Sequence, residues 1–271
     1  MSKFSAPDAE HINGREPPRP GKNRGIEMET KTTPISYRHL RLKDLNRPEY
    51  SHLKLLAYWP LFGFLFFYAE RLQPMRDYHV VHCALDDLIP FNELFLLPYL
   101  FWFAFLIGMH LYTLRYDVET FRKMMHFIIL TYSAALVLFF LFPTCQHLRP
   151  AVFLRDNALT RFMAGFYRFD TNTNVCPSLH VVGSLAVVFA AWHSPRFQTK
   201  GWRAAFAVAG GLISVSTVFL KQHSLWDVVV ALAICAVAYD WCYRREDARG
   251  SETAEPLWSP RKRRAGTQAV K

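Results

Sequence analysis

Two long apolar runs are separated by the polar stretch Lys221-Gln222-His223-Ser224-Leu225-Trp226-Asp227. His223 and Asp227 are four residues apart, so on a helix they would share one face and could form a hydrogen bond. A carboxylate in that position fixes the tautomer of the histidine and stabilises its imidazolium form. Lys221 adds a positive charge beside the pair. Ionisable residues at the mouth of a membrane helix are candidates for function, so this stretch indicates a site.

A second polar cluster, Pro177-Ser178-Leu179-His180, precedes another apolar run. If Ser178 starts a helix there, the free backbone N–H groups of its first turn would favour an anion. Two histidines allow a division of labour at phosphorus. His223, oriented by Asp227, could be the nucleophile, and His180 could protonate the departing oxygen. Phosphoryl transfer depends mainly on such positioning and on charge compensation.

Three further residues could bind the phosphate. Arg149, Ser178 and Lys221 together offer two cations and a hydroxyl group. Each has an ordinary alternative: Ser178 can simply cap a helix, Lys221 can extend to lipid headgroups, and Arg149 can belong to an ordinary loop. A lone histidine near an interface is also more often structural than catalytic. Two histidine clusters at span boundaries nevertheless favour a site. For Asp86 and Asp87 we favour acidic residues without a role over a headgroup contact.

The composition indicates a membrane protein. Hydrophobic residues make up 51% of the chain and aromatic residues 15%. The mean hydropathy of +0.04 averages polar ends with very apolar middle segments. Several segments approach the roughly 20 apolar residues that cross a bilayer. The apolar runs lie at about 52–69, 92–113, 125–142, 179–193, 202–220 and 225–243.

These runs predict an all-α integral membrane bundle of six helices. Residues 143–178, between the third and fourth helices, are predicted to form a long ordered outer loop, because aromatic residues are interspersed with its arginines. The expected organisation is a polar basic tail over 1–51, a six-helix membrane domain over 52–243 and a second basic tail over 244–271.

The distribution of charge predicts the topology. The net charge is +10, but the basic residues concentrate in the tails and in alternate loops, which argues against nucleic acid as the partner. Of the 32 Lys and Arg residues, 24 lie on the side that holds both tails and 7 on the opposite side, with Lys54 inside the first run. The positive-inside rule then places both termini in the cytoplasm. Both histidine clusters fall together on the non-cytoplasmic face.

The motif spacing resembles the superfamily of type 2 phosphatidic acid phosphatases and vanadium haloperoxidases. Its P-S-G-H motif corresponds to Pro177-Ser178-Leu179-His180, and its S-R-x5-H-x3-D motif to Ser216-Thr217, His223 and Asp227. The first motif survives only as Arg149-Pro150. Phe142 stands where that motif has lysine, and Thr217 where the third has arginine. The residues around these motifs resemble more closely the branch of inositol phosphorylceramide synthases. If the chain is similar to that branch, Lys221 of this chain would replace the missing arginine.

The resemblance implies a phosphohistidine mechanism. His223 would be the nucleophile, Asp227 its partner and His180 the general acid, with Arg149, Ser178 and Lys221 on the phosphate and neither a metal nor another cofactor required. The leading hypothesis is a membrane lipid-phosphate phosphatase. Alternatives are transfer of a phosphorylated headgroup onto a lipid alcohol, and a non-catalytic lipid-binding or transport protein. The expected partners are the bilayer and a phospholipid or lipid-phosphate substrate; the specific lipid and the oligomeric state are left open.

Overall fold

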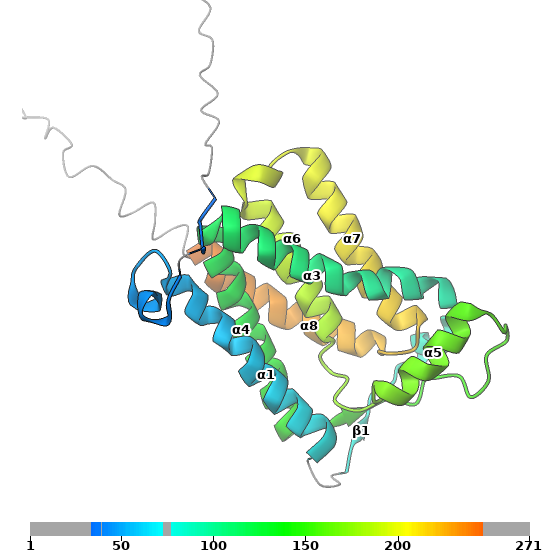
Figure 1. Cartoon of the computed structure of the whole chain (residues 1–271). Coiled ribbons are helices and arrows are strands. Elements are labelled where there is room, and N and C mark those ends of the chain that lie inside the picture. The colour runs from blue at the N-terminus through cyan, green and yellow to red at the C-terminus, as the bar shows by residue number, and fades with distance from the viewer. Residues whose placement is uncertain (1–33, 39, 73–76, 246–271) are drawn as a thin grey trace, which may run out of the picture. The chain divides into compact units, whose positions relative to one another are not determined.

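The computed structural model describes residues 34–38, 40–72 and 77–245, and this part of the chain is mostly helical (Figure 1). Its α-helices are α1 (Tyr58–Phe67), α2 (Ala84–Leu88), α3 (Leu96–Tyr116), α4 (Val118–Leu141), α5 (Ala158–Phe169), α6 (Leu179–His193), α7 (Lys200–Phe219) and α8 (Leu225–Tyr239). Strand β1 (His79–Val80) pairs in parallel with β2 (Thr144–Cys145). Shorter 3-10 and π segments are Leu42–Asn46, Ser51–Ala57, Tyr68–Leu72, Glu93–Phe95, Pro195–Phe197 and Asp240–Arg244.

Four helices among the described residues are long and apolar enough to cross a membrane. They comprise Glu93–Tyr116, Val118–Leu141, Lys200–Phe219 and Leu225–Arg244. This finding is compatible with a membrane protein. Helix α6 is apolar but has only 15 residues. The six-helix count, the outer loop and the sidedness of the termini therefore stay predictions.

Helix α6 is the centre of the packing, and it contacts α3, α4, α7 and α8 (Figure 1). Small residues explain why its neighbours approach so closely. A Cβ at Gly183 would lie 2.8 Å from the Tyr132 hydroxyl and 2.9 Å from the Trp102 ring. A Cβ at Gly210 of α7 would lie 2.8 Å from Val188. The glycine at 183 thus lets α3 and α4 close around the first turns of α6.

Large apolar side chains also cover outward faces of the long helices. In water such a surface would be costly, whereas lipid tails solvate it. Exposed examples are Phe64, Leu97, Phe101, Phe103, Ile107, Leu111, Val208, Leu212, Val229, Leu232 and Val237.

Two polar segments are packed onto this helical body. The connection from α4 to α6 carries β2 and α5, so it contains secondary structure of its own. Part of the predicted N-terminal tail also has structure, since the Ile35 N–H donates to the Arg115 carbonyl at 3.0 Å. The tail residues 1–33 and 246–271 lie outside the described residues, so the domain boundaries at 51 and 244 stay predictions.

Candidate active site

The N-terminus of α8 holds His223 and Asp227 in one hydrogen-bonded unit. Ser224 is the N-cap residue, and Asp227 occupies the third helical position, where its carboxylate accepts from the Ser224 N–H at 3.0 Å. The same carboxylate oxygen lies 3.0 Å from His223 Nδ1. Asp227 is fully buried, whereas the His223 side chain is 12% exposed. Helix capping therefore fixes the carboxylate that orients the imidazole.

The turn between α7 and α8 fixes the backbone just before His223. Lys221 has a φ of 55°, a left-handed conformation that is unfavourable for residues with a side chain. The N–H groups of Gln222 and His223 both donate to the Thr217 carbonyl, at 3.0 and 3.2 Å. Thr217, at the position of the missing arginine, is thus a backbone anchor for the turn, and its own hydroxyl donates to Ser214.

Asp86 holds the start of α8 from outside the helix. Its carboxylate accepts from the Ser224 hydroxyl at 2.6 Å and from the Leu225 N–H at 2.9 Å. Burial raises the pKa of Asp86, but these bonds and that of Cys83 outweigh it, so its pKa lies below the usual value. Asp86 is fully buried. The sequence favours no role for this residue over a headgroup contact, and only its long-range contact with α8 reveals one.

His180 lies in the first turn of α6, close to His223. The two ring centroids are 6.2 Å apart. The His180 ring stacks on Tyr99 and packs against Trp102, at 4.2 and 4.4 Å between centroids. Its Nε2 is buried and has no hydrogen-bond partner within the part of the chain that the structure describes. The structure thus brings the two sequence clusters together, with one ring nitrogen of His180 uncommitted.

Ser178 connects the beginnings of α6 and α8. Its N–H donates to the Asp227 carbonyl at 3.2 Å, although its hydroxyl makes no capping bond to α6. That hydroxyl is fully buried and finds no partner among the described residues. Ser178 does not line the cavity described next. Its observed contact is therefore with the backbone of the residue that orients His223.

Both histidines line a cavity of about 280 Å³. Much of its wall is aromatic: Trp59, Phe62, Phe66, Tyr99, Trp102, Phe103, Tyr132, Phe166 and Phe169. Its polar lining consists of Glu70, Asp170, Thr171, Thr173, Asn174 and Gln222 besides the histidines. None of the described residues that line it is a lysine or an arginine. The cavity can therefore hold an apolar group together with a polar one beside His223.

Arg149 points its guanidinium into the loop around α5. Its Nη atoms donate to the carbonyls of Tyr167, Asp170 and Thr171 at 2.8 to 3.1 Å and to Gln222 Oε1 at 2.6 Å. The guanidinium carbon also lies 4.5 Å from the centroid of the Tyr167 ring. Burial lowers the pKa of Arg149, and the charge of Asp170 opposes that change. Arg149 acts as a clamp on the loop and does not line the cavity of the histidines.

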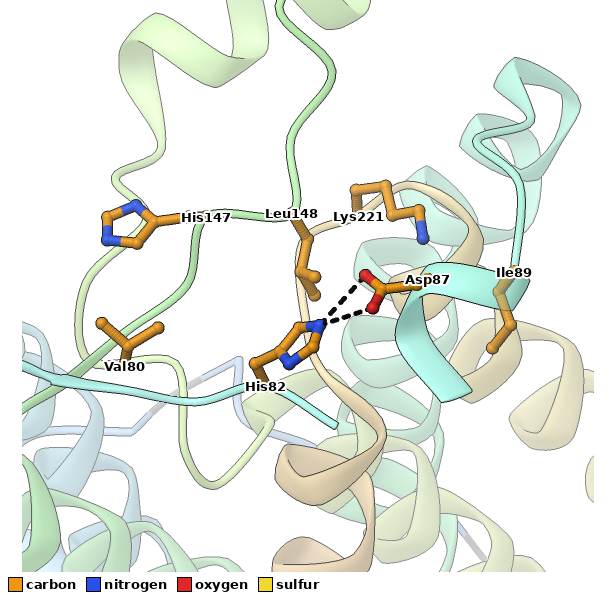
Figure 2. Close-up of a pocket in the computed structure, with 7 residues that line it drawn as sticks. All are labelled: Val80, His82, Asp87, Ile89, His147, Leu148 and Lys221. Atoms are coloured by element: carbon orange, nitrogen blue, oxygen red, sulfur yellow. Dashed lines mark hydrogen bonds and ion pairs between the residues drawn. The ribbon is translucent and has the colours of Figure 1, made fainter. Parts of the chain in front are cut away.

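Lys221 lies at a different cavity, of about 470 Å³, which it lines with His82, Asp87 and His147 (Figure 2). Its ammonium donates to the Asp86 carbonyl at 2.6 Å. His82 and Asp87 form an ion pair of 3.0 Å beside it. The structure thus does not bring the Lys221 side chain together with the two histidines. Within the described residues, no group of three or more His, Cys, Asp or Glu could hold a metal ion.

Two cavity carboxylates were not anticipated from the sequence. Asp170 accepts from Gln222 Nε2 at 2.9 Å, and Glu70 accepts from Asn174 Nδ2 at 2.8 Å and from the Thr171 hydroxyl. Burial raises the pKa of both carboxyl groups, while hydrogen bonds to Glu70 and the charge of Arg149 beside Asp170 oppose that change. No sequence spacing connects Glu70 to Asp170, so only the fold could reveal this pair.

Comparison with known proteins places this site in a family context. The model of the PAP2 superfamily matches residues 123–251, which include both histidine clusters. No curated protein and no solved structure gave a significant match. The resemblance to the branch of inositol phosphorylceramide synthases stays a prediction. Residues 123–251 are thus similar to the type 2 phosphatidic acid phosphatase superfamily, and this similarity supports an enzyme of the phosphatase or phosphotransferase type.

Proposed function

We propose that this protein is a membrane enzyme that transfers a phosphoryl-type group from a phosphorylated lipid through a phosphohistidine on His223. The observation that carries the proposal is the 3.0 Å contact of His223 Nδ1 with buried Asp227, at a cavity shared with His180. An ionised carboxylate only accepts, so Nδ1 carries the proton and Nε2 keeps its lone pair. That tautomer is the one a nucleophilic imidazole needs.

The reaction has two steps in this proposal. His223 Nε2 forms a bond to phosphorus as the bond from phosphorus to the leaving alcohol breaks, and His180 gives the departing oxygen its proton. Asp227 stabilises the charge that develops on the first imidazole. An incoming hydroxyl then attacks phosphorus, returns a proton to His180 and releases His223. The phosphate-binding roles proposed for Arg149 and Lys221 have less support, because neither residue lines this cavity and both donate to backbone carbonyls.

Water or a lipid alcohol could supply that hydroxyl. With water the enzyme is a lipid-phosphate phosphatase, which was the leading hypothesis from the sequence. One observation favours the second candidate, transfer of a phosphorylated headgroup to a lipid alcohol. A phosphomonoester dianion would find no lysine or arginine among the described residues of the cavity wall. A phosphodiester carries one negative charge fewer, so its burial in this cavity is less costly.

The test is turnover by purified full-length protein and by its His223→Ala variant. The substrates are a panel of lipid phosphates and phospholipids, with and without an acceptor alcohol. We expect His223→Ala to lose at least about a thousandfold in rate. The matched control is His147→Ala, an exposed histidine outside the cavity, which should keep its activity. Equal rates for His223→Ala and the unsubstituted protein would refute the proposed nucleophile.

A further inference from the structure

We infer that the lipid donor is a zwitterionic phospholipid whose cationic amine headgroup binds between Glu70 and Asp170, beside the reacting phosphate. This inference rests on the proposed function and names its substrate class. The carrying observation is a cavity wall with two carboxylates, many aromatic rings and, among its described residues, neither lysine nor arginine. Such a wall is complementary to a cation with apolar surroundings.

The two carboxylates are not neutralised by direct ion pairs. Within the described residues, neither Glu70 nor Asp170 forms a salt bridge. The nearby cations donate to other acceptors instead: Arg71 donates to the Phe169 carbonyl, and Arg149 donates to loop carbonyls and to Gln222 Oε1, although the Arg149 charge still acts on Asp170. Burying a charge without a direct partner is costly. A ligand that brings its own positive charge would supply that partner.

Aromatic rings accompany each carboxylate. Phe66 precedes Glu70 by four residues along the α1 helix and its continuation, and Phe166 precedes Asp170 by four residues at the end of α5. All four side chains line the cavity. The rings and the carboxylates therefore face the same space. Ring faces attract an ammonium group, and a desolvated site strengthens that attraction.

Unpaired polar atoms in the cavity wall indicate a ligand that carries complementary hydrogen-bonding or charged groups. Asn174 is 6% exposed, and its buried Oδ1 has no hydrogen-bond partner in the region that the structure describes. Its Nδ2 is already committed to Glu70. The buried Trp102 indole N–H is also unpaired among the described residues, and Trp102 packs against His180. The wall thus offers an acceptor near the carboxylates and a donor for a phosphate oxygen near His180.

The geometry then assigns each part of the donor. Phosphorus lies at His223, the ammonium lies at Glu70 and Asp170, and the apolar part of the lipid lies against the aromatic wall. His223 Nε2 forms its bond to phosphorus, and the bond from phosphorus to the diacylglycerol oxygen breaks. That oxygen takes its proton from His180 and leaves as the free alcohol. The phosphorylated amine headgroup stays on His223 until water or a lipid hydroxyl accepts it.

The experiment measures binding of short-chain lipids to full-length His223→Ala protein, which cannot react at that atom. The probes are dihexanoyl phosphatidylcholine, phosphatidylethanolamine, phosphatidylglycerol and phosphatidic acid, and their binding is followed by isothermal titration calorimetry. We expect the two zwitterionic lipids to bind at least about tenfold more tightly than the two anionic ones. Equal or tighter binding of the anionic lipids would overturn the inference. This comparison of lipid affinities is made on one protein, so it does not depend on the folding of any further variant.

Two variants added separately to that protein, Glu70→Gln and Asp170→Asn, keep the side-chain shapes and remove one charge each. Each should reduce the zwitterionic preference about tenfold, whereas Asp156→Asn, at an exposed ion pair with Arg161, should leave it unchanged. An undiminished preference in both cavity variants would contradict the inference. Turnover of the same lipids reports separately on the proposed function. Preferential binding of the zwitterionic lipids without His223-dependent turnover supports this binding site and refutes the proposed mechanism. His223-dependent turnover without preferential binding supports the mechanism and refutes the binding site.

Discussion

At the scale of single residues, His223 is specified by contacts on two sides. Its Nδ1 faces the buried Asp227 carboxylate, and its backbone N–H is held by the Thr217 carbonyl. Asp227 is in turn held by the Ser224 N–H. The imidazole therefore has little freedom to rotate away from the cavity, and preorganisation of this kind lowers the cost of reaching the transition state.

We predict that Asp227→Asn lowers kcat by roughly a hundredfold to ten thousandfold, because an amide can hold the opposite tautomer of His223. The rate of a single turnover, measured with saturating lipid, checks this. Asp240→Asn, at an exposed ion pair with Arg244 near the other end of the same helix, should stay within about twofold. An unchanged kcat in Asp227→Asn would mean that the carboxylate does not orient the nucleophile.

The sequence could predict His223, Asp227, His180 and their proximity, because these depend on helix spacing and on a charge count. It could not predict the direction of the Lys221 side chain, whose ammonium donates to the Asp86 carbonyl. Nor could it predict that Arg149 clamps a loop. Glu70 was missed because its neighbours in space are about a hundred residues away in the chain, as its contact with Thr171 shows.

At the scale of elements, the first turn of α8 depends on Asp86. This carboxylate lies in α2, more than a hundred residues earlier, yet it accepts from both Ser224 and Leu225. Helix N-termini favour a negative charge and need acceptors for their free N–H groups. Asp86 thus stabilises the element that carries the proposed nucleophile and its partner.

We predict that Asp86→Ala lowers the free energy of unfolding by about 1–3 kcal/mol, because it leaves buried donors unpaired. The pKa of Asp86 is depressed in the folded protein. Its contribution is therefore present above the unfolded pKa, about 3.9, and is lost as pH falls through the lower folded value. Melting curves measured from pH 7 to acidic pH should show a decreasing difference in melting temperature between the variant and the unsubstituted protein. Asp87→Ala, at an exposed neighbour, should change stability by less than about 0.5 kcal/mol.

Helix packing supplies a second test at this scale. Gly183→Ala places a methyl group within 2.9 Å of the Tyr132 hydroxyl and the Trp102 ring, so α3 or α4 must move. We predict a loss of about 1–3 kcal/mol in stability and a lower rate, since Trp102 also packs against His180. Gly211→Ala is the matched control, because nothing lies within 4 Å of its Cβ. Equal melting temperatures for the two variants would contradict this close packing.

At the scale of the whole molecule, the long apolar runs of the sequence fall on helices of the structure, because such runs leave few alternatives. The runs at 92–113 and 125–142 correspond to α3 and α4, and the later runs to α6, α7 and α8. The apolar runs do not predict α2 or α5 as elements. The amphipathic sequence of α5 lies among polar residues and indicates a loop, although its aromatic residues suggest that the loop is ordered.

Topology is testable on the intact protein. The count of basic residues predicts both termini in the cytoplasm and the α4–α6 connection on the opposite face. A cysteine at fully exposed Leu154 should then react with a membrane-impermeant maleimide in intact cells. A cysteine at exposed Lys200 should react only after permeabilisation. The unsubstituted protein corrects for its own cysteines. The reverse labelling pattern would place the candidate site on the cytoplasmic face.

The most direct measurement of the central claim is mass spectrometry of the protein quenched with alkali during turnover of a phospholipid. The account predicts an acid-labile phosphorus adduct on the peptide that contains His223. The adduct should be absent from His223→Ala and should decay at the rate of turnover when donor lipid is exhausted. Steady turnover with no adduct on His223, or with the adduct on His180, would contradict the account.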